Sequence, residues 1–108
     1  MTDVLLVAYE TRPDAVLLAR EVLSQLDSSK FSVDLLVIGE HFEVPKVSKE
    51  AIVISLGGDG TFLRAARVAH SNAATVMGVN LGRVGFLVPT EPSEIVSHVG
   101  VLRWTRSR

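Results

Sequence analysis

The sequence contains no cysteine, which excludes disulfide bridges and thiolate metal sites and fits a reducing compartment. The sequence also has no excess of positive or negative charge. The formal net charge of the 108 residues is -1, which gives no indication of a nucleic-acid partner or an anionic membrane. No apolar run approaches the roughly 20 residues of a membrane span, and Asp3 stands where a signal peptide would carry a basic residue. We therefore expect a cytoplasmic protein with no membrane and no nucleic-acid partner.

Hydrophobic residues make up 47% of the chain, which favours a globular domain over disorder. Short apolar runs bounded by polar or glycine residues predict strands that are buried on both faces. These runs are residues 4–9, 33–38, 51–56 and 75–79, with a brief extended piece at 86–88. Apolar residues at helical spacing predict two helices between the strands. Their expected buried stripes are Val16, Ala19, Leu23 and Leu26 in the first helix, and Phe62, Ala66 and Ala69 in the second.

The order of these elements indicates the fold class. Pro13 and Pro92 suit the first turns of helices, while residues 39–50 are polar and predict a connecting loop. Strands that alternate with helices form crossovers in a parallel sheet covered on both faces. We therefore expect an α/β domain with a Rossmann-like parallel sheet and flanking helices.

A glycine cluster, Gly-Gly-Asp-Gly-Thr at residues 57–61, follows the third predicted strand and precedes a helix. We call it the glycine loop. In open α/β sheets ligands bind at the carboxyl ends of strands, and a helix N-terminus attracts phosphate through its unpaired N–H groups and partial positive charge. Glycines let the backbone approach that phosphate closely. The loop therefore predicts a phosphate-handling site.

Asp59 is the informative residue of the glycine loop, because a site that only held phosphate would gain nothing from a carboxylate. Phosphate transfer to a hydroxyl needs a group that accepts the hydroxyl proton or holds a metal. Alternatively, Asp59 caps the helix, or forms an Asp-Gly hairpin turn. The helical spacing that follows disfavours the hairpin, whereas capping and catalysis are compatible and both stay open.

Arg64 and Arg67 follow in the predicted helix. A cation in the first turns is disfavoured by a few tenths of a kcal/mol, and a nearby anionic ligand would reverse that cost. For either arginine the alternative is a solvated surface side chain, and this alternative is stronger for Arg67.

The glycine-loop motif is shared by NAD kinases, diacylglycerol and sphingosine lipid kinases, and phosphofructokinases. Its continuation, Thr-Phe-Leu-Arg-Ala-Ala-Arg at residues 61–67, resembles NAD kinases, whereas lipid kinases tend to have Asn-Glu-Val there. A second block, Gly-Val-Asn-Leu-Gly-Arg-Val-Gly-Phe-Leu at residues 78–87, is also similar to the NAD kinase pattern. The resemblance runs from the first strand to about Val96.

The resemblance implies roles for particular residues. Asp59 would accept the proton of the 2′-hydroxyl of the adenosine ribose of NAD, Asp59 and Gly60 would contact the dinucleotide, and Arg64 would match the family's basic residue. The phosphate donor would be ATP or inorganic polyphosphate, with a divalent metal such as Mg²⁺, and the family tends to form homo-oligomers. Phe86 would pack against a nucleotide ring or, alternatively, in the core.

The chain departs from the family pattern at its end. NAD kinases continue into a β-rich C-terminal domain with an Asn-Glu pair and a Thr-Pro-Thr-Gly-Ser-Thr-like segment, and neither occurs here. We therefore expect a nucleotide-binding domain at residues 1–99, a divergent basic tail at 100–108, and an N-terminal fragment, truncated and inactive alone. Alternative functions are a lipid kinase-type domain and a non-catalytic nucleotide-binding remnant.

Overall fold

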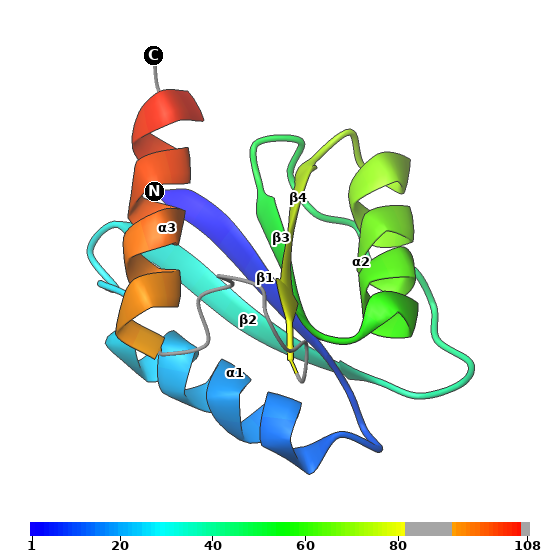
Figure 1. The fold of residues 1–108 in the computed structure, drawn as a ribbon. Helices are drawn as coiled ribbons and strands as arrows, with labels where there is room; N and C mark the ends of the chain where they lie inside the picture. Colours follow the sequence, from blue (N-terminus) through cyan, green and yellow to red (C-terminus); the bar gives the residue numbers. More distant parts are fainter. Residues whose placement is uncertain (82–91, 107–108) are drawn as a thin grey trace.

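The computed structural model describes residues 1–81 and 92–106, in which four strands and three helices alternate along the chain (Figure 1). Their order is β1 (Thr2–Tyr9), α1 (Pro13–Gln25), β2 (Phe31–Ile38), β3 (Ile52–Gly57), α2 (Asp59–Ser71), β4 (Thr75–Asn80) and α3 (Pro92–Arg106). The predicted order of strands and helices is thereby confirmed, with a loop in place of a helix between β2 and β3. The extended piece expected at residues 86–88, including Phe86, lies outside the described residues.

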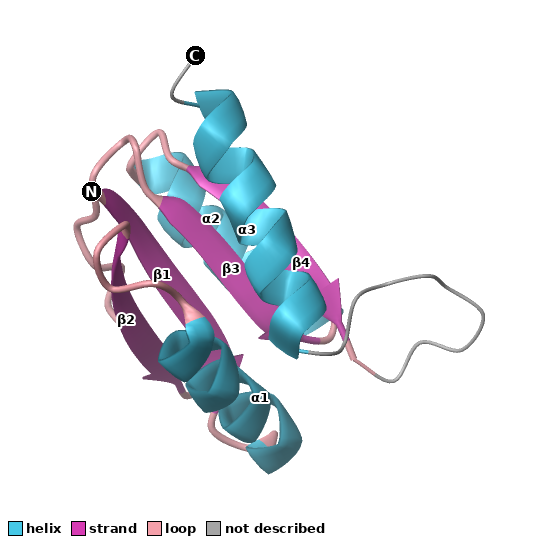
Figure 2. Cartoon of the chain, turned by 90° about the vertical axis from the view of Figure 1, so that its left-hand side faces the viewer, coloured by secondary structure: helices cyan, strands magenta, loops and turns pink. Residues whose placement is uncertain are grey.

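The strands form one parallel sheet in the order β2-β1-β3-β4. Helices α1 and α3 contact each other on one face of the sheet, and α2 covers the other face (Figure 2). Because α1 joins β1 to β2 and α2 joins β3 to β4, the chain leaves the centre of the sheet in opposite directions. The predicted α/β class with flanking helices is confirmed, and the carboxyl ends of β1 and β3 lie at the point where the strand order reverses.

The two central strands are apolar throughout because both of their faces are covered. Side chains alternate between the two faces of a strand, so each of these strands contributes to two cores. The core under α1 and α3 contains Val4, Leu6, Ala8, Ile52, Ile54, Leu56, Ile95 and Val99. The core under α2 contains Leu5, Val7, Val53, Ala65, Val68 and Ala69.

Strands β2 and β4 correct one expectation, because they are the edge strands of the sheet and are not buried on both faces. The pattern of β2 alternates between buried, half-buried and exposed residues, with Val37 41% exposed, and in β4 only Val79 is buried. An apolar run alone does not distinguish an edge strand from a central one, since strand order is set by non-local packing.

The buried stripes of both helices match those expected only in part. In α1, Ala19 and the C-cap residue Leu26 are buried and Val16 packs against the core, as expected, whereas Leu23 is 37% exposed. In α2 the buried residues are Thr61, Ala65, Val68 and Ala69, so Ala69 is confirmed, whereas Phe62 is 39% exposed. The buried stripe of α2 thus begins one residue earlier than expected, which corresponds to a rotation of about 100°.

The segment between β2 and β3, residues 39–51, has no strand or helix, as predicted for a loop. Asn72, the residue after α2, holds it in place. Its amide oxygen accepts a hydrogen bond from the Val47 N–H at 3.0 Å, and its amide nitrogen donates to the carbonyls of Pro45 at 3.0 Å and Val68 at 2.8 Å. The loop is thus fastened to the end of α2 and lies beside that helix.

Candidate active site

In the glycine loop, a single residue separates the end of strand β3 from the start of helix α2. Strand β3 ends at Gly57, Gly58 occupies the N-cap position of α2, and Asp59 is the first helical residue. Gly57 has φ +151°, a conformation that side-chain-bearing residues rarely adopt. Its carbonyl accepts a hydrogen bond from the Leu81 N–H at 2.9 Å, so the loop is tied to the residue that follows β4.

This geometry decides between the alternatives for Asp59. The hairpin interpretation is wrong because a helix of 13 residues begins there. The N-cap interpretation is also wrong, since Gly58, which has no side chain, takes that position. The carboxylate of Asp59 lies in the first turn, where the N–H groups have no partner within the helix and the macrodipole favours negative charge.

Asp59 is exposed and lies on the wall of a cavity of about 290 Å³ at the carboxyl ends of β3 and β4. We call it the Asp59 cavity. Gly78 of β4 keeps this space open, because a β-carbon there would lie 2.7 Å from Cδ1 of Phe62. The described lining residues are Ser55, Gly57, Gly58, Asp59, Phe62, Gly78, Val79 and Asn80.

Ser55 is a lining residue that the sequence reasoning missed. It is 1% exposed, and its hydroxyl has no hydrogen-bond partner among residues 1–81 and 92–106. An unpaired buried hydroxyl costs about 1–3 kcal/mol, so a ligand that bonded it would recover that cost. The signal was present as one hydroxyl in the apolar run of β3, directly before the glycine loop.

Arg64 does not share the Asp59 cavity. One of its guanidinium nitrogens donates to the Gly60 carbonyl at 3.1 Å, and its charged group lies 5.0 Å from the centroid of the Tyr9 ring. The structure therefore brings Gly60 and Arg64 into contact, while Asp59 and Arg64 line separate cavities on two sides of the start of α2.

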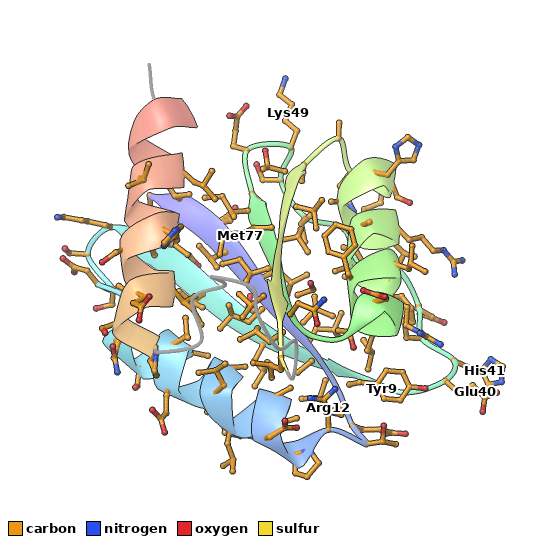
Figure 3. The ribbon with its side chains drawn as sticks, viewed as in Figure 1. Tyr9, Arg12, Glu40, His41, Lys49 and Met77 are labelled. Atoms are coloured by element: carbon orange, nitrogen blue, oxygen red, sulfur yellow. The ribbon has the colours of Figure 1, made fainter. Side chains whose placement is uncertain are left out.

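The second cavity lies at the same end of the sheet. Tyr9, Arg12, Glu40 and His41 all lie at this end, and Lys49 lies at the opposite one (Figure 3). The volume of the cavity is about 530 Å³, and we call it the arginine pocket. Its described lining residues are Glu40, His41, Phe42, Leu63, Arg64 and Arg67.

Comparison with known proteins decides the family. The sequence model of a protein family, the ATP-NAD kinase N-terminal domain, matches residues 40–99, which are more than half of the chain. The chain belongs to the NAD kinase family. The matched segment contains the loop after β2, the glycine loop, α2 and β4, so both cavities are lined mainly by residues within it.

Three relatives illustrate the similarity. An NAD kinase of Mycobacterium tuberculosis is 36% identical over 116 residues, which cover 86% of this chain and 38% of that protein. NAD kinase 1 of Streptomyces coelicolor is 37% identical over 105 residues, covering 91% of this chain and 29% of that protein. An NAD kinase of Corynebacterium diphtheriae is 40% identical over 108 residues, covering 85% and 34%. The alignments thus span about a third of the length of these relatives.

The described residues do not supply a metal site of their own. Residues 1–81 and 92–106 hold no group of three His, Cys, Asp or Glu side chains placed to bind an ion. Mg²⁺ is commonly held by one or two carboxylates together with substrate phosphates. No helix in the described part of the chain is long and apolar enough to cross a membrane.

Proposed function

We propose that this chain is the nucleotide-binding part of an NAD kinase, which phosphorylates the 2′-hydroxyl of the adenosine ribose of NAD to give NADP. One observation carries the proposal. The glycine loop places the carboxylate of Asp59 in the first turn of α2 and on the wall of a cavity at the carboxyl ends of β3 and β4. Relatives that carry the name NAD kinase support the choice of acceptor over the lipid of the related kinases.

In the proposed reaction the ribose 2′-oxygen forms a bond to the terminal phosphorus of ATP or polyphosphate, and the bond to the leaving phosphate chain breaks. Asp59 accepts the hydroxyl proton. The N–H groups of the first turn of α2 and the partial positive charge of its N-terminus stabilise the transferring group. Phosphate transfer has a loose transition state, so the chain contributes mainly positioning and charge stabilisation.

The three site residues predicted from the sequence have different roles in binding. Asp59 and Gly60 contact the dinucleotide at the helix N-terminus. Arg64, held at the Gly60 carbonyl, supplies positive charge one turn further along α2. The buried hydroxyl of Ser55 donates to or accepts from the bound ligand within the Asp59 cavity.

Calorimetric titration of the chain with NAD tests the binding role. We expect NAD to bind, and D59N to weaken binding about tenfold through loss of a charge-assisted hydrogen bond. The matched control is D3N, because Asp3 is also exposed but lies in the first strand at the amino end of the sheet. Absence of NAD binding, or equal effects of D59N and D3N, would refute the proposal.

We also infer that these 108 residues, expressed on their own, transfer phosphate slowly. The described lining residues contact a nucleotide from the side of β3, β4 and α2, and positioning from several sides supplies much of an enzyme's acceleration. NADP formation from NAD, ATP and Mg²⁺ is measured beside an intact NAD kinase from Mycobacterium tuberculosis. Comparable rates would contradict this inference, whereas NAD binding without turnover would support it.

A further inference from the structure

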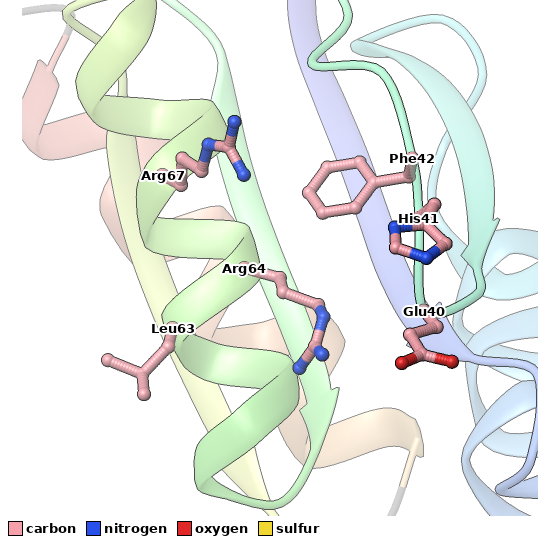
Figure 4. Close-up of a pocket in the computed structure, with 6 residues that line it drawn as sticks. All are labelled: Glu40, His41, Phe42, Leu63, Arg64 and Arg67. Atoms are coloured by element: carbon pink, nitrogen blue, oxygen red, sulfur yellow. The ribbon is translucent and has the colours of Figure 1, made fainter.

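The arginine pocket lies between α2 and the loop that follows β2. Figure 4 shows Arg64 and Arg67 extending from α2 toward Glu40, His41 and Phe42 on that loop. Its volume of about 530 Å³ is within the usual range for pockets that bind small molecules. The hydrogen bonds of Asn72 fasten the loop to the end of α2, so the two walls are held together.

Both arginines are held by aromatic rings. The guanidinium of Arg64 lies 5.0 Å from the centroid of Tyr9, and that of Arg67 lies 5.9 Å from the centroid of Phe42. These are cation–π distances, which orient a side chain without consuming its N–H donors. The two arginines are three residues apart on one helix and therefore project from neighbouring positions.

Neither arginine has an acidic partner among the described residues. Arg12 and Asp14 form an ion pair, whereas no described carboxylate lies within ion-pair distance of Arg64 or Arg67. Glu40 also lines the pocket. Two guanidinium groups therefore face one carboxylate, and the net charge of the described lining is positive. Each guanidinium has five N–H donors in a planar fork suited to phosphate oxygens, and among the described residues Arg64 donates one hydrogen bond, to the Gly60 carbonyl.

We propose that the arginine pocket binds the phosphoanhydride chain of the phosphate donor, whether this chain belongs to a nucleoside triphosphate or to inorganic polyphosphate. This inference rests on the proposed kinase function. Because Arg64 is hydrogen-bonded to Gly60, the pocket begins next to Asp59, on the other side of the start of α2 from the Asp59 cavity. Donor and acceptor thus approach one helix N-terminus from two sides, and Arg67 joins Arg64 as a donor-binding residue.

Calorimetric titrations of the chain with tripolyphosphate, ATP, AMP and NAD test this assignment. We expect tripolyphosphate and ATP to bind more tightly than AMP, because the phosphate chain is the recognised group. R67Q should weaken both about tenfold through loss of charge-assisted hydrogen bonds, while R67K should weaken them less. The matched control is R20Q, since Arg20 is exposed on α1 across the sheet and its loss should change neither affinity.

Two variants, each titrated with NAD and with tripolyphosphate, test the pocket assignment separately from the proposed kinase function. D59N should weaken NAD binding without weakening tripolyphosphate binding, because it removes a negative charge next to the polyanion, whereas R67Q should weaken tripolyphosphate binding and leave NAD binding unchanged. Tripolyphosphate binding without NAD binding would refute the kinase assignment and leave the pocket assignment standing. Failure of tripolyphosphate to bind, equal effects of R67Q and R20Q, or an equal loss of NAD affinity in R67Q would overturn the pocket assignment. Circular dichroism of each variant shows that its fold is retained.

Discussion

Thr61 Oγ1 lies 2.8 Å from the position that a β-carbon on Gly57 would occupy. Real β-carbons do not approach another atom this closely, and the φ of +151° at Gly57 is strained for any residue with a side chain. The close approach arises because the chain turns from β3 into α2 with only Gly58 between them. Glycine at position 57 is therefore required by the turn itself, independently of any ligand.

The first prediction follows from this contact. G57A should lower the free energy of unfolding by about 2–4 kcal/mol, through backbone strain and overpacking against Thr61. The matched control is G58A, because a β-carbon on Gly58 meets no atom within 4 Å. Urea denaturation of both variants measures the difference. Equal losses of stability would show that the contact with Thr61 is not the cause.

Removal of the buried Ser55 hydroxyl should lower NAD affinity without lowering the stability of the fold. S55A should leave the free energy of unfolding unchanged or raise it by about 1 kcal/mol, because the buried hydroxyl has no partner in the described part of the chain. NAD affinity should fall at the same time. S32A, which alters an exposed serine on β2, is the control for both measurements. A clear loss of stability in S55A would contradict the unpaired state of this hydroxyl.

Gly78 should be required for the shape of the Asp59 cavity. In G78A the new methyl group would displace the ring of Phe62, and stability should fall by about 1–3 kcal/mol. Truncation of the ring in the double variant G78A/F62A should recover most of this loss. A double-mutant cycle of unfolding free energies measures the coupling between the two positions. Simple additivity of the two substitutions would count against the contact.

The hydrogen bonds of Asn72 should hold the loop after β2 in place. N72A removes bonds to Val47, Pro45 and Val68, and should cost about 2–3 kcal/mol of unfolding free energy. Tripolyphosphate affinity should fall as well, because this loop forms one wall of the arginine pocket. S71A, one residue earlier and exposed, should change neither quantity. Unchanged tripolyphosphate affinity in N72A would show that the loop keeps its place without Asn72.

The ion pair at the start of α1 should give a small dependence of stability on pH. Hydrogen bonds from Arg12 to Asp14, at 2.9 and 3.1 Å, hold the pKa of Asp14 below its ordinary value of 3.8. A lowered folded-state pKa stabilises the fold above pH 3.8, and this contribution is lost as the pH falls through the folded-state pKa. D14N should therefore be slightly less stable than the parent near neutral pH, with the difference vanishing in acid.

Urea denaturation across this pH range provides the measurement. D34N is the control, since Asp34 is exposed on β2 and forms no ion pair with a described residue. A difference between the parent and D14N that persists below the folded-state pKa would show that the ion pair is not its source.

Local patterns made much of the fold predictable. The four apolar runs were confirmed as strands, the segment at residues 39–50 as a loop, and the helix after the glycine loop began at Asp59. These features depend on residues that are neighbours in sequence, so their periodicity and glycine content indicate them directly. The family resemblance rested on the same kind of local signal, and the family match confirms it.

Non-local contacts account for what the sequence reasoning missed. The helical stripes were predicted only in part, because contact with the sheet, which buries Ala65 and Val68 and leaves Phe62 39% exposed, joins residues distant in sequence. The edge position of β2 depends on strand order, which no single run of residues encodes. Arg67 is exposed, as its surface alternative expected, but its contact with Phe42 was not predictable, because Phe42 is 25 positions away in the sequence and only the folded loop brings the two side chains together.

The sequence by itself determined the strand–glycine–helix unit around Asp59 and the parallel α/β class, because each follows from backbone constraints over a few adjacent residues. Tertiary structure alone decided that Asp59 and Arg64 line different cavities. It also decided that Ser55 is buried beside the glycine loop and that Arg67 joins Arg64 opposite Phe42. These relationships arise where a loop and three strands meet one helix, and the packing of segments distant in sequence sets that geometry.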